Sequence, residues 1–587
     1  MSHAWLARNL ALCLLAAAVA TVPSGGSQPA RPGREELLVS KTPAGNQGGR
    51  LIVSQRGEPK TLNPVLALDL PSREVIYRLM GDLVHIDRST LQTQPALATS
   101  WAVSPDLRRY TLNLRRGIKF SDGFPFTADD VTFSFKVYLD EKVGAPQRDL
   151  LVVENTPIQC RKIDDHTVMF ELARSYAAAE RIFDSIAILP RHLLEKDYQQ
   201  GLLRQVWSLN TPPDKIAGLG PFQLHAYVPG QQLVLRRNPF YWKSDQNGNR
   251  LPYLDEVVFV PSPSEDAQVM RFQSGEVDIV SRVGAQNFSV LQRLQRPGDY
   301  KLFDLGPGFE YNFLFFNLND LRSKGLTDIS RKQSWFRQTE FRQAVSAAID
   351  RQAITQLVYK GRAAPLAIHV TPANTLWVNR AIAQPQRSLE RARKLLESAG
   401  FSWKDGALAD AGGQKVEFSI LTSAGNTQRG QMATIIQDDL KQLGMTVNVV
   451  SLEFRTVIDR ALRTYDYEAA ILSLASGDAD PNSEMNVMLS SGRTHIWNVG
   501  QSHPATAWEA EIDRLMKLQL ITPNYQQRKR IYDRVQQLMA DNQPMICLAS
   551  PNILVAAREK VGNLRPVVLD DYVLWNAEQL FIRKNVP

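Results

Sequence analysis

A pair of adjacent carboxylates is the first candidate for chemistry in the sequence. Asp129 and Asp130 lie in the stretch RRGIKFSDGFPFTADDVTFSF, residues 115–135, a few residues after three basic side chains. Two carboxylates in different environments can serve as general acid and general base. The same residues also fit a helix start, because Thr127 can cap the first turn and Asp130, three residues later, can complete a capping box.

The apolar spacing that follows favours the helix start. Val131, Phe135 and Tyr138 recur at the i, i+4 and i+7 positions of one helical face. Both carboxylates would then lie in the first turn, where the helix dipole favours negative charge by about 0.3 to 1 kcal/mol each. We therefore interpret the pair as a helix N-terminus and expect the functional carboxylate elsewhere in the chain.

Recognisable catalytic and metal-binding motifs are absent from the sequence. None of the eight histidines lies four residues from another, and no Cys-x-x-Cys occurs, so we expect no metal site. The chain also lacks a Gly-Lys-Ser/Thr phosphate loop, a Gly-x-Gly-x-x-Gly turn and a Gly-x-Ser-x-Gly elbow, and we expect no cofactor. A catalytic site assembled from distant residues stays open. Ligand capture nevertheless fits the chain better than catalysis by an enzyme.

Composition places the chain among soluble globular proteins of several domains. It has 587 residues, 44% hydrophobic and 22% charged, which is enough for two or three cores. The net charge of +8 is spread along the chain without a basic block, so we expect no nucleic-acid partner. Beyond the N-terminus no apolar run is long enough to insert into a membrane. Whether Cys160 and Cys547 pair is left open, because the sequence does not show their proximity.

The N-terminus has the pattern of an export signal. Arg8 precedes an apolar run, Leu10 to Val19, that is too short to span a bilayer and closes on small residues. We expect a signal peptide over 1–28, a Pro/Gly/Ser-rich linker over 29–48 and a periplasmic mature protein. Cys13 lies inside the apolar run, so we expect no lipid anchor.

Alternating strand and helix patterns predict α/β domains. The strand-like run that begins at Leu51 is followed by helical spacing at Val75, Ile76, Leu79, Met80 and Leu83. The pattern restarts with the buried strand YNFLFFN at Tyr311 and continues as strands and helices to about residue 540. No internal repeat is visible, which excludes solenoids and propellers.

Five blocks, in this order, resemble family 5 of the extracellular solute-binding proteins, the oligopeptide- and dipeptide-binding components of ABC importers. The blocks are RRGIKFSDGFPFTADDVTFSF, GLGPFQLHAYVPGQQLVLRRNPFYW, RFQSGEVDIV, FFNL followed by FRQAVSAAIDRQAI, and ARKLLESAGF. The resemblance covers the chain from about residue 50 to its end.

The resemblance implies an α/β, two-lobed periplasmic-binding-protein fold of type II that closes by hinge bending. Lobe one would combine a discontinuous domain, 49–95, 219–310 and 541–587, with a small extra domain, 96–218. Lobe two would be 311–540. Ligand would bind between the lobes and favour the closed form, which the permease recognises.

The family fixes a peptide's α-ammonium with a carboxylate on a loop that follows a strand of lobe two. Here the strand AAILSL precedes the loop ASGDADPNSEMN, in which Asp478 matches most directly and Asp480 is the alternative. Ser476 and Gly477 would line the pocket beside them. A carboxylate suits a partly desolvated ammonium ion. Without the resemblance, the loop would read as an Asx turn with solvated carboxylates.

Four further residues are candidates for contact with ligand. Asp69 and Leu70 correspond to the ligand-facing loop of lobe one, although Asp69 could equally cap the following helix. Arg429, in the loop before a helix expected from Gln431, matches a carboxylate-binding or polar pocket position; a solvated arginine is the alternative. Trp497 could stack on a ligand side chain, or be a partly buried surface residue.

One departure from the family affects the ligand. Peptide binders usually carry an aromatic residue just before the key aspartate, whereas Ala475, Ser476 and Gly477 stand there in this chain. We expect a monomer that captures an oligopeptide for an ABC importer permease. The alternatives are a nickel complex, an opine or an oligosaccharide as ligand, a secreted peptide hydrolase, or a peptide-holding chaperone or receptor.

Overall fold

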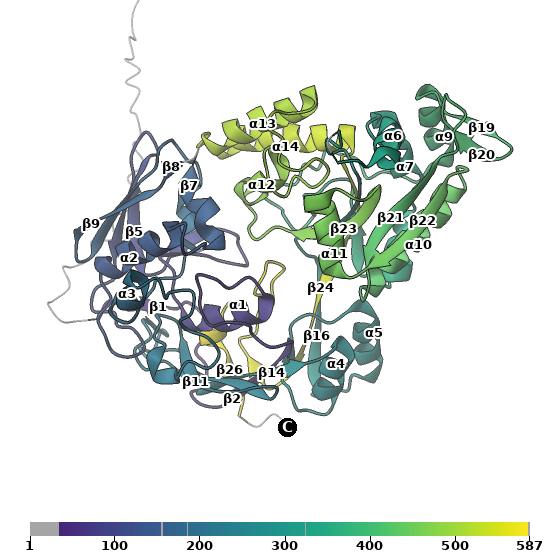
Figure 1. The fold of residues 1–587 in the computed structure, drawn as a ribbon. Helices are drawn as coiled ribbons and strands as arrows, with labels where there is room; N and C mark the ends of the chain where they lie inside the picture. Colours follow the sequence, from purple (N-terminus) through teal and green to yellow (C-terminus); the bar gives the residue numbers. More distant parts are fainter. Residues whose placement is uncertain (1–34, 154–155, 185, 323, 585–587) are drawn as a thin grey trace, which may run out of the picture.

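The computed structural model describes residues 35–153, 156–184, 186–322 and 324–584; the predicted signal peptide lies outside them. Two large clusters of buried apolar side chains form two bodies. The first, lobe one, is built from residues before 308 and after 552, and the second, lobe two, from residues 309–549 with small contributions from lobe one. Figure 1 shows these bodies joined where the strands β16 and β24 run side by side. The structure is a mixed α/β fold with two lobes, as predicted.

A single strand carries the main sheet from one lobe into the other. β24 (Met545–Arg558) pairs with β17 (Glu310–Phe316) along its first half. Its second half pairs with β15 (Ile279–Val280) and β16 (Tyr300–Pro307). β16 leads directly into β17, so the chain crosses between the lobes at two adjacent places. Such paired crossings are a natural hinge.

Lobe one is organised around the strand predicted at Leu51. β2 (Arg50–Arg56) lies between β14 (Glu256–Ser262) and β15 and is parallel to both. A hairpin is formed by β11 (Phe222–Val228) and β12 (Gln232–Arg237). Helix α1 (Leu70–Leu79) buries Val75, Ile76 and Leu79, as its spacing predicted, but it ends at Leu79, so Met80 and Leu83 of the predicted face lie beyond it. Helices α4 (Glu265–Gln273) and α5 (Ala285–Leu294) complete this part.

Asp129 and Asp130 lie in the first turn of a helix that covers the small sheet of lobe one. This sheet contains β5 (Ala98–Val103), β6 (Arg109–Leu114), β10 (Thr167–Glu171) and β9 (Gln159–Asp164). Helix α2 (Ala128–Leu139) packs on this sheet. Its first turn has the predicted capping box, in which Asp130 accepts from the Thr127 amide at 2.9 Å. Asp129 pairs with Lys162 at 2.9 Å. Both carboxylates therefore have structural partners.

The capping box gives a stability prediction. Thr127→Ala removes the hydroxyl that accepts the Asp129 amide at 3.3 Å, and we expect the free energy of unfolding to fall by about 1 kcal/mol. Urea unfolding measures the change. Thr132→Ala, four residues into the same helix, is the control and should change stability by no more than about 0.5 kcal/mol. Equal effects of the two substitutions would contradict the capping role.

Lobe two places parallel strands beside the crossing strands. β21 (Glu417–Ser423) is parallel to both β22 (Thr446–Leu452) and β23 (Ala469–Ala475), and β23 pairs antiparallel with β17. The helices of this lobe include α7 (Thr339–Ala348), α9 (Leu389–Ser398), α10 (Thr427–Lys441), α13 (Ala507–Leu520) and α14 (Tyr525–Asn542). Because β21 and β23 are parallel, the loops that follow them leave the sheet at the same edge.

Part of the predicted linker is instead folded onto lobe one. β1 (Leu38–Val39) pairs in parallel with β13 (Lys243–Ser244), and Glu35 forms an ion pair with Arg250. The Pro/Gly/Ser composition of the linker did not indicate these contacts, because they depend on residues about 200 positions away.

Two observations concern the cysteines and the membrane. Cys160 and Cys547 are both free thiols, one in the small sheet of lobe one and one buried in β24. Within the described ranges, every helix is too short or too polar to cross a membrane.

Candidate functional site

A cavity of about 520 Å³ lies between the two lobes. Lobe one contributes one face of α1, including Arg73, Ile76 and Tyr77, and lobe two contributes the loop after β23, including Gly477 and Asp478. A volume of this size suits a small ligand. The loop reaches the cavity because parallel strands direct their carboxyl ends to a common edge, where such sheets bind ligands.

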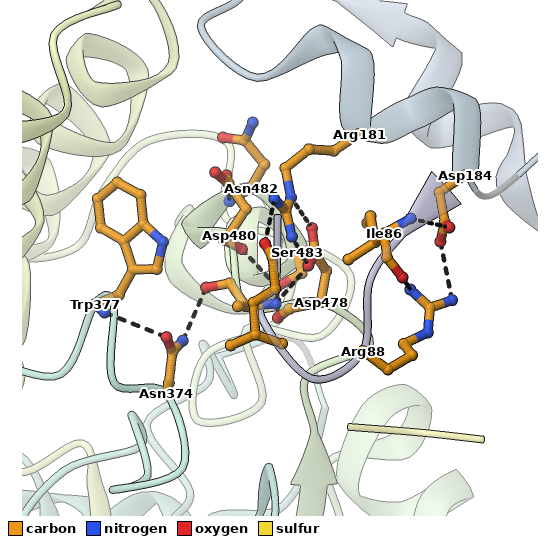
Figure 2. Close-up of polar contacts among 12 residues, drawn as sticks. Ile86, Arg88, Arg181, Asp184, Asn374, Trp377, Asp478, Asp480, Asn482 and Ser483 are labelled. Carbon is orange, nitrogen blue, oxygen red and sulfur yellow. Dashed lines mark hydrogen bonds and ion pairs between the residues drawn. The ribbon is translucent and has the colours of Figure 1, made fainter. Parts of the chain in front are cut away.

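Asp478 lies at the wall of this cavity and already has a charged partner. Arg181, in the 3₁₀ turn η2 (Ala179–Asp184) of lobe one, donates Nε to Asp478 Oδ2 at 2.5 Å and Nη2 to Oδ1 (Figure 2). The two side chains are 14% and 19% exposed. Burial alone would lower the pKa of Arg181, but the hydrogen bond and charge of Asp478 outweigh it and raise that pKa. The ion pair therefore connects the two lobes across the cleft.

Arg181 was absent from the sequence prediction. It lies 297 residues before Asp478, in a segment that no motif marks. Its Nη1 also donates to the Leu91 carbonyl at 3.0 Å, which holds the guanidinium in place from the lobe-one side. Only the folded chain brings these residues together.

Asp480 differs from Asp478 although only one residue separates them. Its oxygens accept from Nη1 and Nη2 of Arg528 at 2.7 and 2.6 Å, and both side chains are nearly buried, at 7% and 5% exposed. Asp480 also caps the short turn that begins at Pro481. The geometry therefore gives Asp480 a structural role in joining this loop to α14.

The loop of lobe one that was predicted to face ligand caps helix α1. Asp69 accepts from the Ser72 amide at 3.0 Å and from its hydroxyl at 2.9 Å, which is the capping alternative stated for it. Leu70 is the first residue of α1. The cavity is lined by Leu68 and Arg73 on either side of these two residues.

Arg429 lines a second interlobe cavity, of about 370 Å³. It lies in the first turn of α10, which begins at Thr427 and not at Gln431 as predicted. Its guanidinium donates to the hydroxyls of Ser423 at 3.1 Å and Ser473 at 2.7 Å. Burial lowers its pKa. The wall also includes three more arginines and two glutamates: Arg56, Arg282, Arg362, Glu265 and Glu310.

Trp497 is a core residue. Its side chain is 0% exposed, and Nε1 donates to Glu509 at 3.2 Å. Neither the predicted stacking on ligand nor a partly exposed position agrees with this burial. Its flanking polar residues, Thr494 and Asn498, gave the sequence the appearance of a surface loop.

Ser476 and Gly477 divide between two environments. Ser476 donates its hydroxyl to Glu484, a buried carboxyl that also accepts from Tyr311 at 3.2 Å. Gly477 lines the large cavity, and a side chain added there would meet open space. Of the two, Gly477 is therefore the residue beside the candidate ligand.

A compact acid and histidine group lies on the lobe-one wall of the same cavity. Asp82, His85 and Asp184 place one possible ligand atom each within 4.8 Å of one another. Asp184 is committed to Arg88 at 3.0 Å and to the Ile86 amide at 2.7 Å (Figure 2). Burial lowers the pKa of His85, but Asp82 outweighs burial and raises it. Asp82, His85 and Asp184 therefore all have hydrogen-bond partners within lobe one.

Comparison with known proteins places the chain in a family. The family model described as bacterial extracellular solute-binding proteins, family 5 middle, matches residues 92–495. This chain belongs to that family. Its description is that of a family of solute-binding proteins.

Three known proteins illustrate the range of this similarity. A probable ABC transporter-binding protein of Deinococcus radiodurans is 28% identical, over 86% of this chain and 87% of its own. The oligopeptide-binding protein AppA of Bacillus subtilis is 25% identical over 92% of each chain, and its structure with a nonapeptide has a TM-score of 0.71. NikZ of Campylobacter jejuni, solved with Ni(L-His), has a TM-score of 0.71 at 20% identity and covers 90% of this chain and 99% of its own.

Proposed function

We propose that this chain captures an oligopeptide in the cavity between its lobes and delivers it, as a monomer, to the permease of an ABC importer. The observation that supports this most is the cavity of about 520 Å³ that residues of both lobes enclose, with Asp478 on its wall. A ligand that contacts both lobes favours the closed form by its difference in affinity for the two forms. The proposed location is the periplasm, reached through a signal peptide over 1–28 and without a lipid anchor.

Within this proposal, the ligand-facing set is smaller than the set that the resemblance implied. Asp478, Gly477 and Arg429 line interlobe cavities. Asp480 also lines the large cavity, but both of its oxygens are bound by Arg528, and Trp497 is buried within lobe two. Arg73 and Tyr77 of α1 take the place of Asp69 and Leu70 on the opposite wall.

A non-peptide ligand is the second candidate. It is favoured by the run Ala475, Ser476 and Gly477, which leaves the residues before Asp478 without an aromatic ring. The arginines around Arg429 also suit an acidic group, because guanidinium binds carboxylates in a bidentate manner. NikZ shows that this fold accommodates a small metal complex.

Thermal unfolding with and without ligand tests the function. A ligand at about 100 times its Kd should stabilise the protein by about 2.7 kcal/mol, which raises Tm. The probe is a random pentapeptide pool that contains both free and N-acetylated amino termini. A rise in Tm with small organic acids or metal chelates, and none with the pool, would favour the second candidate.

Mass spectrometry after incubation separates binding from hydrolysis. Intact peptide recovered in a one-to-one complex supports capture. Cleaved peptide, formed catalytically, would overturn it in favour of a secreted hydrolase.

A further inference from the structure

The lobes touch at a second place, away from the crossing strands. The segment Tyr176–Arg181 of lobe one lies against lobe two, where the Ala177 amide donates to the Leu520 carbonyl at the end of α13, at 2.7 Å. Leu91, whose carbonyl holds Arg181, is buried in the apolar cluster of lobe two. We call this contact, formed by Leu91, Ala177 and Arg181 on one side and Asp478 and Leu520 on the other, the clasp.

The clasp includes the carboxylate that the proposed function assigns to ligand. Arg181 occupies both oxygens of Asp478. Bidentate arginine–carboxylate pairs are the stronger and more directional ion pairs, and this one is largely shielded from water. A ligand ammonium at Asp478 would have to displace the guanidinium.

Displacement by a ligand ammonium would leave the Arg181 guanidinium without its charged hydrogen-bond partner. Its remaining hydrogen bond is to the Leu91 carbonyl, a neutral acceptor. Asp480, the next aspartate of the loop, is already bound by Arg528. Leaving a shielded charge without its partner is unfavourable. A competing ammonium must therefore gain more free energy at Asp478 than is lost when the Arg181–Asp478 pair breaks. A ligand with an uncharged end group has no such cost.

We propose that Arg181 is a specificity-determining residue: its pair with Asp478 holds the lobes together and selects for solutes that have no free ammonium at this end of the cavity, such as N-blocked peptides. This inference rests on the proposed function, because it concerns which solutes the cleft accepts. It also predicts that the protein without ligand is closed more often than it would be without the clasp.

Solution shape tests the clasp independently of any ligand. Small-angle scattering of the unliganded protein should show a larger radius of gyration for Arg181→Gln and for Asp478→Asn than for wild type. The charge reversal Arg181→Asp with Asp478→Arg should return the radius toward wild type. Arg148→Gln, which removes a pair with Glu141 inside lobe one, is the control and should match wild type. Equal radii for all variants would overturn the closing role.

Titration calorimetry tests specificity with two matched pentapeptide pools, one with free and one with N-acetylated amino termini. Wild type should favour the acetylated pool, and Arg181→Gln should shift the affinity ratio toward the free pool by about tenfold. An unchanged ratio would overturn the specificity assignment, whatever the scattering shows. If neither pool binds wild type or variant, the peptide ligand of the proposed function fails and so does the selection for N-blocked peptides, while scattering still decides the closing role.

Discussion

Asp480→Asn is expected to lower the free energy of unfolding by about 3 to 5 kcal/mol, because it removes the countercharge of a buried arginine. Arg528 is 5% exposed and contacts both oxygens of Asp480. Asparagine offers one neutral oxygen in their place, so Arg528 keeps its charge without an adequate partner. Urea unfolding followed by circular dichroism measures the loss.

The control for this prediction lies on the same helix. Asp533→Asn removes a pair with Lys529 on α14, whose side chains are 29% and 21% exposed, and it should change stability by no more than about 0.5 kcal/mol. If Asp480→Asn costs no more than this control, the Arg528 pair does not hold the loop in place. The folded fraction of Asp480→Asn should still bind ligand, whereas a substitution at a residue that contacts ligand directly should weaken binding.

The contrast between Asp478 and Asp480 shows where sequence reasoning reaches its limit. Both fit the same Gly/Asp/Pro loop, which follows the strand β23, as the sequence predicted. Both aspartates line the cavity, and their different partners, Arg181 and Arg528, are 297 and 48 residues away. Local patterns cannot show partners at such separations.

Local patterns succeeded where the physics itself is local. The capping box at Thr127 was correctly predicted, because its donors and acceptors lie within one helical turn. The buried face of α1 was also correct, because helical periodicity determines which residues face the sheet. The prediction for Trp497 was wrong for the opposite reason. Its burial comes from packing against Glu509 and Trp508 of α13, which the polarity of the neighbouring sequence does not indicate.

The pH dependence of stability should reveal the buried carboxyl of Glu484. Burial raises its pKa from 4.5 to about 7, although the hydrogen bond from Tyr311 acts in the opposite direction. In the folded chain Glu484 therefore keeps its proton at pH values where the unfolded chain has lost it. This contribution to stability is complete below the unfolded pKa and is lost as pH rises through the folded pKa.

Glu484→Gln should remove that dependence, because glutamine cannot ionise. The free energy of unfolding of the variant, relative to wild type, should rise by about 3 kcal/mol between about pH 5 and about pH 8. Other raised carboxyls, such as Glu74 at about 7 and Asp571 at about 6, are present in both proteins and cancel in the difference. Urea unfolding of both proteins across this range gives the comparison.

Glu511→Gln is the control for this titration. Arg514 lowers the pKa of Glu511 through a hydrogen bond, so its carboxylate is ionised in both the folded and unfolded chain over the same range and the difference from wild type should be flat. A flat difference for Glu484→Gln as well would mean that Glu484 is already ionised in the folded protein. The bonds from Ser476 and Tyr311 would then stabilise a buried anion directly behind the loop that carries Asp478.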